Sequence, residues 1–217
     1  MRIAVISDMH GNDLAFETAF SSVRFGVGVT REVGMDLADL GIRRTLVLTD
    51  RTIGRLRPVQ IVLESLAASG VEAVLYDRVQ VEPTDHAFLD AIEFASQVGA
   101  DAFVAVGGGS TIDTAKAVNL YTTYPPADFL DYVNRPVGKG LAVPGMLKPL
   151  MAVPTTAGTG SETTGVSVFD VTSLRVKTGI ASRRLKPTAP IYPLSPPKTC
   201  SAPSRKPKPA ARFAHTQ

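Results

Sequence analysis

Two stretches of this chain decide its fold: Val106 to Lys116, VGGGSTIDTAK, and Val153 to Gly165, VPTTAGTGSETTG. Each stretch places glycines and hydroxyl residues directly after a short apolar run. A buried strand that ends in such a turn presents free backbone amides, and a helix that follows adds the positive end of its dipole. Both stretches are therefore typical of loops that bind phosphate groups.

Around these stretches, short runs rich in Val, Leu and Ile alternate with segments of helical periodicity. Strands are expected over residues 45–49, 71–76, 102–106 and 150–153, and helices over residues 59–67, 84–98 and 110–121. This alternation predicts a Rossmann-like α/β fold, a parallel sheet with helices on both faces. Ligands of such sheets bind at the carboxyl ends of the strands, where Asp50, the turn at 107–110 and the loop at 155–164 all fall.

The segment 167–182 alternates apolar and polar residues on either side of Thr172 and Ser173. This pattern predicts a β-hairpin. We expect the hairpin to cross the mouth of the site.

Residues 189–217 differ in composition from the rest, with seven prolines, five basic residues and no acid. We expect disorder there, because such a segment buries too little apolar surface to offset its ordering entropy. An out-of-frame end explains the abrupt change more simply than a Pro-rich ligand or a basic tether. The expected organisation is an extension of uncertain origin at 1–14, a nucleotide-binding domain at 15–188 and a disordered tail at 189–217.

The net charge of +3 comes from that tail, since the rest of the 217 residues holds 18 basic and 20 acidic side chains. This distribution argues against a nucleic-acid partner. The single cysteine, Cys200, excludes a disulfide framework, and there is no 18-residue apolar stretch or signal-peptide pattern. We expect a cytoplasmic protein without a membrane partner, and leave a homo-oligomer open.

The glycines of the first stretch have two interpretations. Gly107, Gly108 and Gly109 would let the backbone approach a pyrophosphate, and Ser110 or Thr111 could cap the next helix. The spacing is not GxGxxG, however, and a tight strand-to-helix turn accounts for the glycines equally well.

Asp50 follows the strand 45–49 directly. A carboxylate in that place can accept both hydroxyls of an adenosine ribose and repel a 2′-phosphate, which favours NAD over NADP. Arg51 weakens the exclusion of NADP, and a turn or helix-cap aspartate is an equal alternative.

The second stretch surrounds Gly158 and Gly160 with hydroxyl side chains, which suit a ligand with many oxygens. These hydroxyl residues are Thr155, Thr156, Thr159, Ser161, Thr163 and Thr164. Glu162 could be a base, but a solvated charge or a local hydrogen-bond acceptor is the more common role of a loop glutamate. Asp113 and Lys116 are expected to form a surface helix pair, with a cofactor contact by Asp113 as the alternative.

In combination, both stretches and the segments VTREVGMDL, YDRVQVEPTD, AIEFA, DFLDYV and LKPLMAVPTT resemble the iron-containing (group III) alcohol dehydrogenase superfamily. Within it, the chain is most similar to the hydroxyacid-oxoacid transhydrogenases, from about Ala15 to Thr188. The resemblance implies oxidation of 4-hydroxybutyrate to succinate semialdehyde and reduction of 2-oxoglutarate to 2-hydroxyglutarate, with the hydride passing through NAD.

The resemblance also implies the cofactor contacts. They match Asp50 at the ribose, Gly107, Gly108, Gly109, Ser110 and Asp113 around the pyrophosphate, Thr155, Thr156 and Thr164 on the nicotinamide side, and Lys177 in the hairpin. Many relatives carry an asparagine before Pro83, where this chain has Glu82, so no contact is carried over there.

Members of the superfamily resemble one another in a second, all-helical domain, whose aspartate and three histidines hold divalent iron or zinc that polarises the alcohol oxygen. Nothing after Thr188 matches that domain, and His10, His86 and His215 are too scattered to build the metal site. No metal ligand or catalytic residue is therefore assigned. The chain is expected to be a truncated, inactive member; an NAD-binding module without turnover and a non-binding remnant are the alternatives.

The first residues, MRIAVISDMHGN, resemble the opening of calcineurin-like metallophosphoesterases. Asp8 and His10 could ligate a metal there only if GD and GNH-type motifs followed, and none does. An early start codon or a fused fragment is the simpler explanation.

Overall fold

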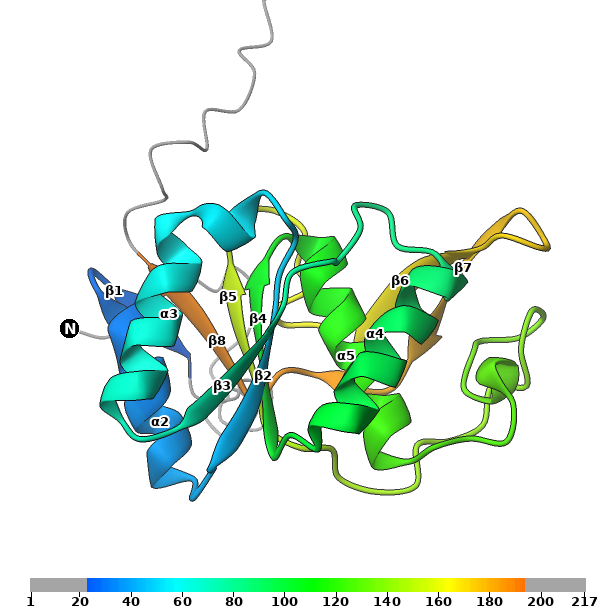
Figure 1. The fold of residues 1–217 in the computed structure, drawn as a ribbon. Coiled ribbons are helices and arrows are strands. Elements are labelled where there is room, and N and C mark those ends of the chain that lie inside the picture. Colours follow the sequence, from blue (N-terminus) through cyan, green and yellow to red (C-terminus); the bar gives the residue numbers. More distant parts are fainter. Residues whose placement is uncertain (1–22, 194–217) are drawn as a thin grey trace, which may run out of the picture.

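The computed structural model describes residues 23–193, which form a six-stranded parallel sheet with helices on both faces (Figure 1). The strand order is β1-β8-β5-β4-β2-β3. The strands are β1 (Arg24–Gly26), β2 (Arg44–Leu48), β3 (Glu72–Tyr76), β4 (Ala102–Gly107), β5 (Leu150–Pro154) and β8 (Ala189–Pro193). The predicted Rossmann-like α/β fold is confirmed.

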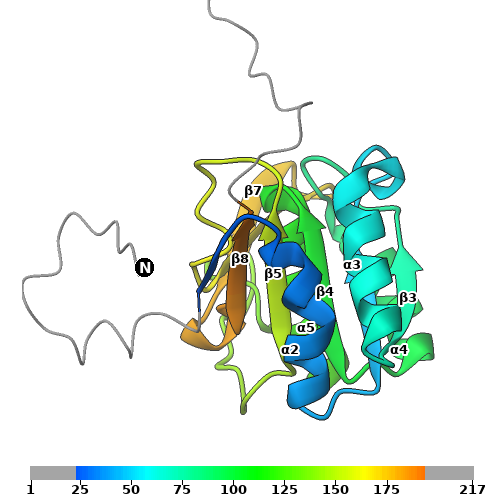
Figure 2. The ribbon, with the colours of Figure 1, turned by 90° about the vertical axis from the view of Figure 1, so that its left-hand side faces the viewer.

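Alternate residues of the strands pack on opposite layers of helices. Val47 and Val104 face α2 (Val33–Asp39) and α3 (Arg57–Ala68), which cover one side of the sheet (Figure 2). Leu46 and Phe103 contribute to the core under α4 (Asp85–Val98) and α5 (Gly109–Thr123) on the other side. Since both faces are covered, the central strands are apolar along their whole length, and all six residues of β4 are buried.

The predicted hairpin is present as the antiparallel strands β6 (Val166–Val171) and β7 (Val176–Ala181). It packs beside α5 and α4, where Phe88, Leu120 and Phe169 share a third core (Figure 1). Helix α5 thus lies between the sheet and the hairpin, and every residue from Thr111 to Tyr121 is buried. The chain also contains short 3₁₀ helices at Val29–Glu32, Ile53–Arg55, Phe129–Asp131 and Arg183–Leu185.

The expected domain boundary at residue 188 differs from the structure. Strand β8, the first part of the expected tail, lies inside the sheet between β1 and β5, and its Ile191 is 0% exposed. The elements β1 and α2 were not predicted either. The remaining expectations for the tail concern residues 194–217, and those for the N-terminal extension concern residues 1–14; both lie outside the described residues.

Within residues 23–193, no helix is long and apolar enough to cross a membrane.

Candidate functional site

A cavity of about 270 Å³ lies at the carboxyl ends of the central strands. In the strand order, β3 lies on one side of the neighbouring strands β2 and β4, and β5 lies on the other. The connection after β2 and the connection after β4 therefore run in opposite directions along the sheet, and the cavity lies at this topological switch point. Six predicted contact residues line it: Asp50, Gly108, Gly109, Ser110, Thr155 and Thr156. Thr111 and Ile53 complete that part of the wall.

Asp50 is held rigidly at one end of the cavity. Its Oδ1 accepts hydrogen bonds from the backbone N–H groups of Thr52 at 2.8 Å and Ile53 at 2.9 Å. Asp50 is therefore a turn aspartate, as one of the two interpretations predicted, but only its Oδ1 atom makes the bonds of the turn. Because each carboxylate oxygen has two acceptor sites, the same side chain retains acceptor capacity for ligand hydroxyls.

Neighbouring protein atoms lie close to all three glycines, and most closely to Gly107 and Gly108. A Cβ on Gly107 would lie 2.3 Å from Thr111 Oγ1, and a Cβ on Gly108 would lie 3.0 Å from Thr156 Oγ1. A side chain at 107 would therefore force Thr111 on α5 to move, whereas a side chain at 108 requires only a small movement of the exposed Thr156 hydroxyl.

The N-terminus of α5 opens on the cavity without a side-chain cap. Its N-cap residue is Gly108, so the expected cap by Ser110 or Thr111 is wrong. Ser110 Oγ instead accepts a hydrogen bond from Glu82 N–H at 3.3 Å. An uncapped helix N-terminus of this kind offers its first amides and its dipole to an anion.

The β5–β6 loop, residues 155–165, covers this helix end. Thr155 N–H donates to Gly107 O at 2.9 Å, which ties the loop to the end of β4. Glu162 is only 8% exposed and accepts hydrogen bonds from the Thr159 hydroxyl at 3.5 Å and the Tyr192 hydroxyl at 3.2 Å. Of its two expected roles, Glu162 therefore has that of a local hydrogen-bond acceptor and not that of a solvated charge. Thr164 is exposed and does not line the cavity.

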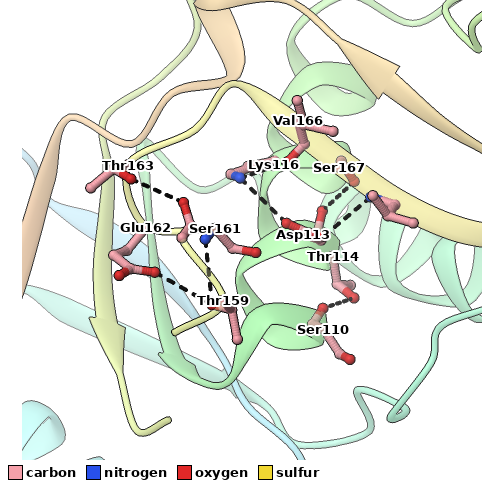
Figure 3. Close-up of polar contacts among 12 residues, drawn as sticks. Ser110, Asp113, Thr114, Lys116, Thr159, Ser161, Glu162, Thr163, Val166 and Ser167 are labelled. Carbon is pink, nitrogen blue, oxygen red and sulfur yellow. Dashed lines mark hydrogen bonds and ion pairs between the residues drawn. The ribbon is translucent and has the colours of Figure 1, made fainter. Parts of the chain in front are cut away.

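Asp113 and Lys116 form an ion pair with an Nζ–Oδ1 distance of 3.3 Å (Figure 3). The expectation of a surface pair is wrong, since the hairpin covers this side of α5 and Lys116 is 0% exposed. Burial raises the pKa of Asp113 and lowers the pKa of Lys116. Each charge opposes the shift of its partner.

The structure does not bring every predicted contact into the cavity wall. Gly107, Asp113, Thr164 and Lys177 lie outside it, and Lys177 pairs with Asp170 at 3.2 Å on the hairpin. No hairpin residue lines the cavity, so the expected crossing of its mouth is not observed.

Sequence reasoning missed one wall of the cavity, the segment Val79–Val81. This segment follows β3 shortly after its carboxyl end, as Asp50 follows β2. The position of VQV after a predicted strand was thus the available signal.

Among residues 23–193, no three His, Cys, Asp or Glu side chains come together as a metal site would require. His86, on α4, is exposed, whereas His10 and His215 lie outside the described ranges. The described residues therefore do not fit the metal that the resemblance implies.

The chain is similar to several proteins named mitochondrial hydroxyacid-oxoacid transhydrogenase. The Xenopus laevis protein is 58% identical over 193 residues, which cover 89% of this chain and 41% of the relative. The Mus musculus protein is 60% identical over 81% of this chain and 38% of its own length. This chain thus spans about two fifths of these relatives. Their names point to mitochondria, so the expectation of a cytoplasmic protein is wrong.

Solved structures match the same region. An NADH-dependent butanol dehydrogenase from Thermotoga maritima is 28% identical, with a TM-score of 0.72 over 80% of this chain and 42% of that one. A sulfoacetaldehyde reductase from Bifidobacterium kashiwanohense, solved with NAD⁺, is 27% identical, with a TM-score of 0.71 over 79% of this chain and 44% of that one. The sequence profile of iron-containing alcohol dehydrogenases matches residues 21–192, which include the first four residues of β8. The chain belongs to the iron-containing alcohol dehydrogenase family.

Proposed function

We propose that residues 23–193 bind NAD(H) in the cavity between β2, β4 and β5. One observation carries this proposal: a carboxylate, an uncapped helix N-terminus and two threonine hydroxyls converge on a single cavity. Asp50 would accept hydrogen bonds from the adenosine ribose, and the first amides of α5 would face the pyrophosphate. Thr155 and Thr156 would bind the nicotinamide half.

The two chemical ends of the cavity support this orientation. A carboxylate suits the neutral hydroxyls of a ribose, whereas a helix N-terminus suits the negative pyrophosphate. Asp50 and Gly109 belong to different strand ends, so the ribose and the pyrophosphate would bind to separate segments. One similar protein, the sulfoacetaldehyde reductase, was solved in complex with NAD⁺.

We propose further that this region serves a hydride-transferring oxidoreductase of the hydroxyacid-oxoacid transhydrogenase type, in mitochondria. The names of relatives more than half identical to the chain support this assignment. In such a reaction, 4-hydroxybutyrate loses a hydride and a proton to become succinate semialdehyde, and 2-oxoglutarate gains both to become 2-hydroxyglutarate. Bound NAD carries the hydride between the two half-reactions. Because residues 23–193 supply no metal-ligand cluster, we expect the 217-residue polypeptide alone to bind nucleotide without turnover.

The test is a fluorescence titration of the 217-residue chain with NADH. The chain contains no tryptophan, so the fluorescence of bound NADH is measured without interference from indole groups. Saturable binding that NAD⁺ competes away is the expected result, and an absence of saturable binding by folded protein would contradict the cofactor assignment.

A second assay separates binding from catalysis. The chain is incubated with NAD⁺, 4-hydroxybutyrate and 2-oxoglutarate, with and without Fe²⁺ or Zn²⁺, and 2-hydroxyglutarate is measured by mass spectrometry. No product above the protein-free control is expected. Metal-dependent product would show that the polypeptide completes a catalytic site by itself.

A further inference from the structure

The ion pair between Asp113 and Lys116 lies outside the cavity wall, and yet both residues are buried, with Lys116 0% and Asp113 7% exposed. Removing two charges from water is costly, and a buried pair seldom adds net stability compared with apolar residues of similar size. The contacts of the pair therefore indicate what it does in this fold.

Both charged groups connect α5 to the first strand of the hairpin (Figure 3). Lys116 Nζ donates to the backbone carbonyl of Val166 at 2.7 Å, directly after the β5–β6 loop ends. Asp113 Oδ2 accepts from the backbone N–H of Val168 at 3.1 Å. In addition, Ser167 Oγ donates to the backbone carbonyl of Asp113 at 2.8 Å. Three consecutive residues of β6 are thus bound to one turn of α5.

The pair also reaches the loop itself. The Ser161 side chain is near enough to Asp113 to oppose the rise in the pKa of that carboxyl, and the negative charge of Glu162 opposes the fall in the pKa of Lys116. Ser161 and Glu162 are buried, whereas residues 156–159 at the tip of the same loop are exposed. The loop is therefore anchored through its second half, while its first half contributes Thr155 and Thr156 to the cavity.

We propose that Asp113 and Lys116 are positioning residues that hold the β5–β6 loop against α5, and that neither side chain contacts the nucleotide. The proposal rests on the NAD(H) site described above. It replaces the direct contact that the resemblance implies for Asp113, because Asp113 does not line the cavity and is only 7% exposed. The position of the loop in turn determines how the nicotinamide half binds.

Three variants of the full chain test the proposal. Lys116→Met removes the ammonium that holds Val166. Ser161→Ala removes the buried loop hydroxyl that acts on Asp113, without unpairing a buried charge. Lys148→Met is the matched control, since Lys148 Nζ also donates to a backbone carbonyl at 2.7 Å, that of Ala100. This control contact precedes β4 and β5 and therefore lies at the opposite end of the sheet.

Two readouts are needed. Hydrogen exchange followed by mass spectrometry reports on the loop without any ligand. Dissociation constants for NADH and for ADP report on binding, because ADP fills only the end of the cavity near Asp50 and the helix N-terminus. Far-UV circular dichroism establishes that each variant is folded at the temperature of the measurement.

Lys116→Met is expected to speed exchange in peptides of residues 155–165 and to weaken NADH binding about tenfold or more, as loss of a charged hydrogen bond does. Ser161→Ala is expected to act in the same direction by about threefold. ADP binding should change less than about twofold in both variants, and Lys148→Met should match wild type in the loop and in both affinities.

Unchanged loop exchange in folded Lys116→Met and Ser161→Ala would overturn the proposal, as would equal losses of NADH and ADP affinity. If Lys116→Met does not fold, Ser161→Ala alone decides. If the wild-type chain binds no NADH but its loop loosens in these variants, the positioning role stands and the proposed function fails.

Discussion

The hydroxyl of Tyr192 donates a hydrogen bond to Glu162 Oε1 at 3.2 Å and so joins strand β8 to the β5–β6 loop. Burial, followed by the negative charge of Glu162 and the hydrogen bond to it, raises the pKa of the Tyr192 phenol. The second half of the loop is therefore held on two sides: Tyr192 on β8 bonds to Glu162, and Lys116 on α5 bonds to Val166, the residue that follows the loop. A segment expected to be a disordered tail contributes to the structure of the site.

The Tyr192→Phe variant is expected to lower the free energy of unfolding by about 1 kcal/mol, the usual cost of one lost hydrogen bond. Urea denaturation measures this change. Amide exchange in residues 155–165 should also accelerate. Tyr132→Phe is the control, since it loses a hydroxyl bond of 3.0 Å to the Tyr124 carbonyl far from the loop. Equal loop exchange in the two variants would contradict the anchoring role of Tyr192.

Asp50→Asn should alter the choice between NADH and NADPH. The amide oxygen of asparagine can still accept the two backbone bonds that hold the turn, so the fold should be retained. Without the negative charge, repulsion of a 2′-phosphate disappears, and the ratio of the NADPH to the NADH dissociation constant should fall about tenfold. Fluorescence titrations with both nucleotides measure the ratio. An unchanged ratio in folded protein would show that Asp50 does not face the ribose.

Gly107→Ala and Gly108→Ala should differ in their effect on stability. The new Cβ at 107 would lie 2.3 Å and 2.6 Å from two atoms of buried Thr111, and overpacking of this kind costs about 1–3 kcal/mol. At 108, the tightest contact is 3.0 Å to the hydroxyl of exposed Thr156, which can rotate away. Thermal unfolding should therefore give a clearly lower Tm for Gly107→Ala alone. A similar decrease of Tm in both variants would mean that the backbone conformation of the turn, and not the contact with Thr111, is the reason for glycine at position 107.

The buried Asp113 carboxyl should leave a signature in the pH dependence of stability. Its pKa in the folded state is raised above 3.8 by burial, so the native protein binds more protons than the unfolded chain in the pH range just above that value. The contribution of the Asp113 carboxyl to the free energy of unfolding is present at low pH and is lost as the pH rises through the pKa of the folded state. The unfolding free energy of wild type minus that of Asp113→Asn should thus fall with rising pH in this range. A difference that rises instead would mean that the pairing with Lys116 outweighs burial.

Local periodicity was sufficient to predict the central strands of the sheet and the helices that connect them. The expected helix at 84–98 matches α4, whose N-cap Thr84 accepts a hydrogen bond from Ala87 N–H and whose end is Gly99 in a left-handed conformation. Such signals depend on neighbours in the chain and are visible without a fold. The same holds for the strand ends that carry Asp50 and Gly108 into the cavity.

Features that depend on contacts between residues far apart in the sequence could not be predicted from local periodicity. Strand β8 has the composition of the proline-rich segment after it, with Pro190 and Pro193 in five residues, and only its place between two other strands makes it a strand. The spacing of Asp113 and Lys116 fits a solvent-exposed pair. Their burial follows from the hairpin, which adds a third layer that the pattern of α5 does not indicate.

The place of β8 also affects the order in which the domain can fold. The first described strand, β1, pairs only with β8 in the described sheet, and β8 in turn pairs with β5. On a ribosome, β1 therefore emerges early but has no partner until residues 189–193 have been made. Until then, β5 presents an unpaired edge to other chains, and closing the sheet requires contacts between the two ends of the domain. A nascent chain of this sequence is therefore most exposed to mispairing just before β8 is complete.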